Sequence, residues 1–123
     1  MRVEEVYRPG ALMCNATDPL SAVAREMTSK HVGALAVLDG NIIIGIVSER
    51  DIVRAAAEGV DTAHARAGTF ASTDVQTARF AEDTTDVARR MLDAGIRHLP
   101  VVQDHTVVGM IAMRDLLAIE AWL

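Results

Sequence analysis

The feature of this 123-residue sequence that most limits its possible folds is an internal repeat. At an offset of 64 positions, the stretch from Gly45 to Asp51, GIVSERD, aligns with the stretch from Gly109 to Asp115, GMIAMRD. Further identities fall in the same register without a gap: Val23, Ala24, Arg25, Met27, Leu35 and Val37 align with Val87, Ala88, Arg89, Met91, Leu99 and Val101. A unit of about sixty residues is too short to build a large core, so we expect two copies that pack as one module.

Each copy changes its hydrophobic period in the same order. The spacing of Leu20, Val23 and Met27 predicts an amphipathic helix, with Asp18 as its N-cap and Pro19 in its first turn. Short apolar runs around turns predict a hairpin, and a second helix follows. The expected elements of the first copy are a lead-in at 11–15, a helix at 19–30, strands at 34–38 and 42–47, and a helix at 49–58. Those of the second copy are a lead-in at 75–79, a helix at 84–93, strands at 99–102 and 106–111, and a helix at 113–121.

This order predicts an α+β fold in which helices and strands form two layers. The chain is 50% apolar but holds only one Trp, one Tyr and two Phe, so we expect a thin core of aliphatic side chains and Met. We expect repeat 1 at residues 1–62, a linker at 63–72 and repeat 2 at 73–123.

Composition argues against several classes of function. The single Cys14 has no partner for a disulfide, which favours a reducing, cytoplasmic setting, and no apolar run is long enough for a signal peptide or a membrane span. A net charge of −5 disfavours binding to nucleic acid. The four histidines lack the spacing of a metal site, and no pattern of catalytic residues is present, so we expect no metal, no required cofactor and no enzymatic activity.

The repeated GIVSERD motif has two interpretations. As a capping box, Ser48 accepts a hydrogen bond at the start of a helix and Asp51 lies in its first turn. As a binding site, a helix N-terminus with free N–H groups attracts a phosphate, and the carboxylate accepts hydrogen bonds from a ribose diol. The second copy has Ala112 in place of the serine yet keeps Asp115, which favours a second role for the aspartate.

The doubled motif, together with the stretch Arg97-His98-Leu99-Pro100-Val101-Val102, resembles the tandem CBS domain pair known as a Bateman module. The resemblance covers essentially the whole chain. It implies two repeats related by a pseudo-two-fold axis, two clefts between them that bind AMP, ADP, ATP or S-adenosylmethionine, and regulation of a partner through a change of shape. It also implies a homodimer.

The resemblance assigns residues to each cleft. In one cleft Asp51 and Ser48 of the first repeat would face the basic residues Arg97 and His98 of the second, with Arg114 as a further basic candidate. The lead-in around Val75 to Thr77 would sandwich the adenine. The opposite cleft has lost the hydroxyl and the basic pair and is expected to be weak or empty; it comprises Asp115, Arg50, Gly33 and Ala34.

Other interpretations stay open. The chain could be a dimerisation module without a ligand, a sensor of S-adenosylmethionine, or an enzyme that uses Asp51 as a base. Arg97 could be a solvated surface charge, and His98 a partly buried residue with a backbone partner. The implied partner is an effector protein, and Trp122 could pack on a partner subunit or on the chain's own helices.

Overall fold

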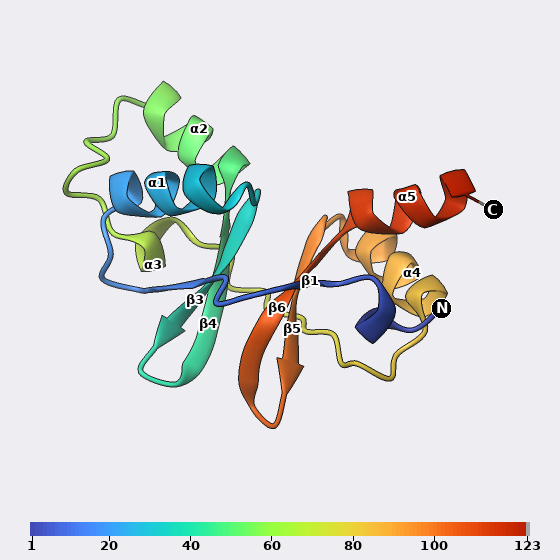
Figure 1. Cartoon of the computed structure of the whole chain (residues 1–123). Coiled ribbons are helices and arrows are strands. Elements are labelled where there is room, and N and C mark those ends of the chain that lie inside the picture. Colours follow the sequence, from blue (N-terminus) through green and yellow to red (C-terminus); the bar gives the residue numbers. More distant parts are fainter. Residues whose placement is uncertain (123) are drawn as a thin grey trace. The chain divides into compact units, whose positions relative to one another are not determined.

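A computed structural model describes the backbone of residues 1–122 and the side chains of residues 1–119 (Figure 1). The helices are η1 (Val3–Glu5), α1 (Leu20–Lys30), α2 (Glu49–Ala57), α3 (Ala67–Phe70), α4 (Thr84–Ala94) and α5 (Met113–Trp122). The strands are β1 (Arg8–Pro9), β2 (Met13–Asn15), β3 (Ala34–Asp39), β4 (Ile42–Ser48), β5 (His98–Gln103) and β6 (Thr106–Ala112). The predicted α+β class is confirmed. Trp122 has no described side chain, so its predicted packing lies outside the described residues.

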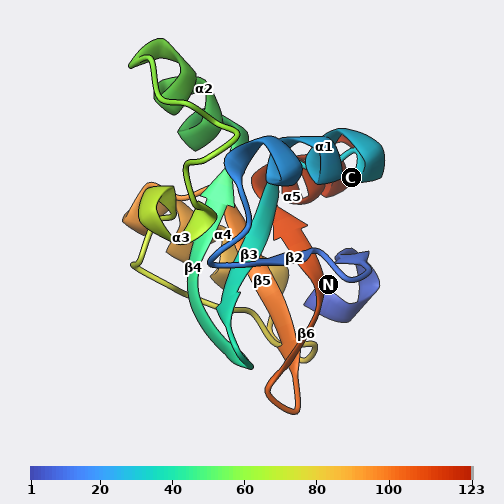
Figure 2. The same ribbon diagram turned by 90° about the vertical axis from the view of Figure 1, so that its left-hand side faces the viewer.

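The chain forms two compact units, each with a three-stranded sheet. The unit Met13–Val75 holds the sheet β2-β3-β4, and the unit formed by Met1–Leu12 and Gln76–Leu123 holds β1-β6-β5. In each unit the hairpin turn lies at the opposite end of the strands from α1 and α2 or from α5 (Figures 1 and 2). Both hairpins carry a register shift at the same repeat position, between Val37 and Leu38 and between Val101 and Val102.

Each unit takes one segment from the other repeat. β1 pairs with β6 of the second repeat, and Ser72 pairs with Ile46 in β4 of the first. The two donated segments are themselves repeat equivalents, because Arg8 and Ser72 lie 64 positions apart, as do Val3 of η1 and Ala67 of α3. Both Val3 and Ala67 are fully buried. The start of each repeat therefore completes the unit of the other.

Because of this exchange, the compact units do not coincide with the predicted sequence repeats. Residues 1–12, which we assigned to repeat 1, belong to the unit of the second repeat, because β1 needs the edge of β6. Residues 67–72, which we assigned to a linker, include α3 and the segment that pairs with β4.

The predicted N-cap of the first helix is wrong. The Asp18 carboxylate accepts a hydrogen bond from the Asn15 N–H (2.9 Å), and Pro19 occupies the N-cap position without a side-chain cap. In the second repeat the equivalent position is Asp83, whose carboxylate does cap α4 by accepting from the Thr85 N–H (2.8 Å). The first helix lacks a side-chain cap because Pro19 stands where the second repeat has Asp83, and Asp18 corresponds instead to Glu82, which accepts from the Arg79 amide in the same way.

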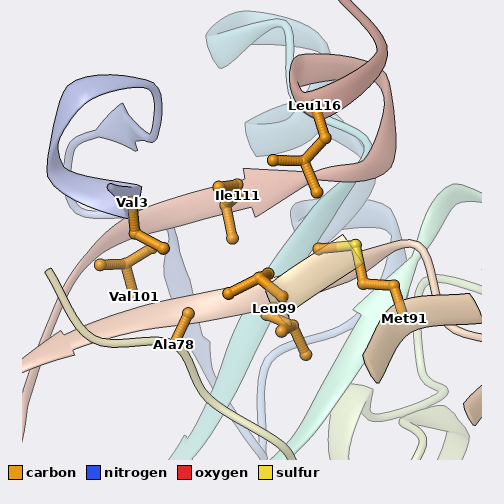
Figure 3. Close-up of a cluster of buried hydrophobic side chains, with 8 residues drawn as sticks. Val3, Ala78, Met91, Leu99, Val101, Ile111 and Leu116 are labelled. Atoms are coloured by element: carbon orange, nitrogen blue, oxygen red, sulfur yellow. The ribbon is translucent and has the colours of Figure 1, made fainter. Parts of the chain in front are cut away.

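The core of the second repeat's unit shows how helices cover the sheet. Met91 of α4 and Leu116 of α5 lie against strand residues Leu99 and Ile111 (Figure 3). Val87 of α4 belongs to the same cluster. Val3, Ala78 and Val101 belong to the same cluster, so the donated N-terminal segment is part of this core. No helix in the described part of the chain is long and apolar enough to span a bilayer.

Two glycines permit the exchanged segments to approach. A Cβ on Gly109 would overlap the Arg8 carbonyl oxygen and lie 2.8 Å from ring carbons of Tyr7. A Cβ on Gly45 would lie 2.7 Å from the Ser72 carbonyl oxygen. The glycine that opens GIVSERD and GMIAMRD is thus explained by the crossing backbone rather than by a ligand.

We predict that Gly109→Ala destabilises the protein by about 2–4 kcal/mol, because the clash is with backbone that must move. Urea unfolding measures the loss, and hydrogen exchange should show faster exchange in residues 1–12. Gly40→Ala is the matched control: nothing lies near its added Cβ, and only its positive φ (62°) is strained, so we expect a loss of about 1 kcal/mol. Equal effects of the two substitutions would contradict the packing argument.

We predict that Cys14 is unreactive in the folded protein. Burial, followed by the charge of Asp18, raises the pKa of its thiol to about 11 from 9.0. At about pH 8 this shift alone lowers the thiolate fraction roughly a hundredfold, so alkylation by iodoacetamide should be at least that much slower in native buffer than in concentrated urea. Because folding favours the protonated thiol, the associated stability is complete below about pH 9 and is lost as the pH rises towards 11. Similar alkylation rates in the two solvents would show that the thiol is accessible.

Candidate functional site

The motif that ends β4 forms a complete capping box. The Asp51 amide donates to Ser48 Oγ (3.3 Å), and the Asp51 carboxylate accepts at Oδ2 from the Ser48 amide (2.8 Å) and hydroxyl (3.0 Å). Both side chains are half-buried. Asp51 Oδ1 has no partner among the described residues. The capping interpretation is confirmed, and the carboxylate is held with one oxygen left to accept further hydrogen bonds.

The second repeat keeps half of this arrangement. Asp115 Oδ2 accepts from the Ala112 amide (2.9 Å), although Ala112 offers no side-chain acceptor in return. The two hydrogen bonds of a capping box are therefore separable, and Asp115 has a structural role without a hydroxyl beside it. The presence of Asp115 beside Ala112 is therefore explained by the hydrogen bond from the Ala112 amide and is no sign of a second role.

The backbone amides at these helix starts are less available than we expected. The Glu49 amide donates to the Gly33 carbonyl (2.9 Å), and the Met113 amide donates to the Arg97 carbonyl (2.8 Å). With the Ser48 and Asp51 amides also engaged, the start of α2 lacks the open set of N–H groups that a phosphate needs. A bound phosphate would therefore depend on side-chain cations, and the helix N-terminus alone does not provide a site.

The remaining candidate residues fall in both units. Ser48, Asp51, Arg50, Gly33, Ala34 and Val75 lie in the unit Met13–Val75, and Arg97, His98, Arg114, Asp115 and Thr77 lie in the other. In its unit, the Arg97 carbonyl accepts from the Met113 amide at the start of α5, and His98 pairs with Ala112. In the other unit, the Gly33 carbonyl accepts from the Glu49 amide at the start of α2, and Ala34 pairs with Ser48. The structure therefore brings Ser48 to Asp51. The other residues predicted for the same cleft, apart from Val75, belong to the other unit.

The three candidate arginines are available to bind an anion, because they are not used in ion pairs with acidic side chains of the described residues. Arg50, Arg97 and Arg114 are exposed, and none takes part in an ion pair within the described part of the chain. His98 is half-buried and Ala34 is fully buried. Among residues 1–119, the His, Cys, Asp and Glu side chains form no group of three or more that could hold a metal ion.

One contact that we did not predict lies at the predicted adenine segment. Arg90 Nη1 donates to the Thr77 carbonyl (3.0 Å), and Arg90 Nη2 donates to Glu82 Oε2 (2.8 Å), which also accepts from the Arg79 amide (3.1 Å). The repeat offered part of this signal: Glu82 lies 64 positions after Asp18, which binds the Asn15 amide in the same way. The role of Arg90 could not be predicted from the repeat, because the equivalent residue of the first repeat is Glu26.

Comparison with known proteins identifies the family. The model of the CBS domain matches residues 3–58 and 67–121, and these two matches begin 64 positions apart, as the repeat does. An uncharacterised 17.7 kDa protein of Acidianus ambivalens is 33% identical over 100 residues, which are 79% of this chain and 59% of that protein. The CBS domain-containing protein YhcV of Bacillus subtilis is 29% identical over 98 residues, 79% of this chain and 69% of that protein. The chain spans less than two thirds of several relatives, down to 33% of one from Thermofilum pendens.

Solved structures share the fold over nearly the whole chain. A protein with CBS domains from Burkholderia ambifaria has a TM-score of 0.87 at 26% identity, covering 98% of this chain and 95% of that one. The CBS domain pair of protein MJ0100, solved with 5-methylthioadenosine and S-adenosyl-L-methionine, has a TM-score of 0.88 at 22% identity, covering 99% and 97%. With two matches of the family model across both repeats, the chain belongs to the CBS domain family and is a tandem pair of CBS domains.

Proposed function

We propose that this CBS pair is a sensor that binds an adenosine nucleotide, AMP, ADP or ATP, in a cleft between its repeats and signals to an effector protein by a change of conformation. CBS domains are generally regulatory or sensor modules. The observation that carries the proposal is the fixed carboxylate of Asp51, whose Oδ1 has no described partner. An ionised oxygen with two lone pairs accepts hydrogen bonds from the 2′- and 3′-hydroxyls of a ribose.

In the proposed cleft each group has a distinct task. Asp51 accepts from the ribose, and Ser48 holds the Asp51 carboxylate. Arg97 and His98, with Arg114, face the phosphates, and the segment from Val75 to Thr77 sandwiches the adenine. The exposed arginines support this assignment because they have no described acidic partner to compete with a phosphate.

The opposite cleft is proposed to bind weakly. Asp115 keeps an oxygen for a ribose, but Gly33 and the buried Ala34 stand where the stronger cleft has Arg97 and His98. Arg50 is the remaining cation there. Without a second cation, binding of a nucleotide phosphate loses contacts that contribute about 1.5–3 kcal/mol each.

A sensor of S-adenosylmethionine is the second candidate, favoured by the complex of the structurally similar MJ0100 pair. That ligand has a ribose and an adenine but no phosphate, so its binding would use Asp51 and not require Arg97. For either ligand we propose a homodimer that acts on a separate effector protein.

We predict that Asp51→Ala abolishes stabilisation by the ligand. A ligand present at a hundred times its dissociation constant adds about 2.7 kcal/mol to the free energy of unfolding, which thermal shift with AMP, ADP, ATP and S-adenosylmethionine would detect. The substitution also removes a helix cap and so lowers the stability of the free protein by about 1 kcal/mol.

Asp115→Ala is the matched control, because it removes the equivalent capping carboxylate from the other repeat. We expect a similar loss of basal stability with the ligand response retained. If no ligand stabilises the wild type, or if both variants respond equally, the proposed cleft is wrong.

We predict that Arg97→Ala lowers the affinity for ATP by about ten- to a hundredfold while leaving the affinity for adenosine unchanged, because a charge-assisted contact to phosphate contributes about 1.5–3 kcal/mol. Isothermal titration calorimetry with both ligands makes the comparison. The control is Arg25→Ala, an exposed arginine on α1, which changes the net charge equally. A loss of affinity for adenosine as well would assign Arg97 to a structural role.

A further inference from the structure

The two repeats hold their lead-in segments differently. In the first, Met13–Asn15 form the parallel strand β2 along β3. In the second, the equivalent residues 77–79 make a single bridge, between Ala78 and Val101. At the position of Ala36 in β3 the second repeat has Pro100, which has no N–H to donate to a neighbouring strand. The lead-in of the second repeat therefore has weaker support from the backbone.

The side chain of Arg90 on α4 also holds this lead-in segment in place. Its guanidinium joins two groups at once, the Thr77 carbonyl (3.0 Å) and the Glu82 carboxylate (2.8 Å). The same Glu82 oxygen accepts from the Arg79 amide (3.1 Å), so one carboxylate and one guanidinium bind both ends of the segment 77–79. The Arg90 and Glu82 side chains are 35% and 38% exposed. An isolated ion pair with that exposure contributes little, but a planar guanidinium with two fixed acceptors also imposes geometry.

We propose that Arg90 is a positioning residue for recognition of the adenine ring: it holds the Thr77 segment in the conformation that binds the base. This inference rests on the function proposed above. Arg90 does not contact the ligand. It raises the fraction of molecules in which the segment is ready to bind, and the apparent dissociation constant varies inversely with that fraction.

The test compares Arg90→Met with Arg89→Met. Arg89 is the next residue on α4, and its described ion pair is a long one to Asp86 (3.9 Å) between exposed side chains. The two variants thus lose the same charge, and only one loses the contact to Thr77. We expect Arg90→Met to weaken adenosine and AMP by the same factor, about tenfold, and Arg89→Met to leave both affinities unchanged.

Two further measurements separate positioning from general stability. Arg90→Lys keeps the charge but not the fork, so it should recover part of the affinity. In the protein without ligand, the Arg79 amide should exchange faster in Arg90→Met than in Arg89→Met, because Glu82 is no longer held. If Arg90→Met is too unstable, Glu82→Gln tests the same contact with a smaller change.

The outcomes are distinct. If the wild type binds adenosine but Arg90→Met lowers only the melting temperature, the positioning role is overturned and the proposed function stands. If Arg90→Met weakens AMP and not adenosine, Arg90 contacts the phosphate and positioning is again overturned. If the wild type binds none of the tested ligands, the proposed function falls, and the positioning role falls with it.

Discussion

The rest of the structure depends on the close approach of a donated segment to a glycine in the last strand of each hairpin. At Gly109 the incoming backbone is Arg8, and at Gly45 it is Ser72. A side chain at either glycine would keep the segment away, and with it Val3 or Ala67, which are fully buried. Each repeat of about sixty residues is thus incomplete without the other, which is how two short units reach a stable size. The glycines mark where the exchange occurs, and so the same motif that ends in a candidate binding carboxylate begins with a requirement of the fold.

The carboxylate at the other end of the motif serves the helix and leaves capacity for a ligand. Asp51 uses Oδ2 to receive the Ser48 amide and hydroxyl. Because both bonds go to one oxygen, the geometry that stabilises α2 also fixes the direction of Oδ1. Asp115 is oriented in the same way by the Ala112 amide. Capping and recognition are therefore compatible uses of one residue, and the proposed difference between the two clefts rests on the residues assigned to them, Arg97 and His98 for one and Gly33 and Ala34 for the other.

Local signals predicted most of the secondary structure. Periodicity and turn residues gave the helices and strands to within a residue or two, because amphipathic spacing and glycine conformations act over a few neighbours. The exchange was not predictable, since residues 1–12 and 67–72 show no period and owe their structure to contacts with distant strands. The predicted Asp18 cap was wrong because the N-cap falls one residue later, at Pro19, and the Asp18 carboxylate accepts from the Asn15 amide instead. At the site, Ser48 and Asp51 follow from sequence spacing, whereas Arg90 acts across thirteen residues through a carbonyl that no side-chain pattern reveals.

The two repeats also differ in how they hold their lead-in segments. In the first repeat, Ala36 allows β2 to lie along β3, so the lead-in is fixed by backbone hydrogen bonds. In the second, Pro100 shortens that ladder, and Arg90 and Glu82 hold the segment through side chains. Backbone ladders respond little to a ligand, because each bond depends on its neighbours. A segment held by one backbone bridge and by the side chains of Arg90 and Glu82 can shift when those side-chain contacts change. Under the proposed function, we therefore expect a bound ligand to shift the lead-in at Thr77 more than the strand β2.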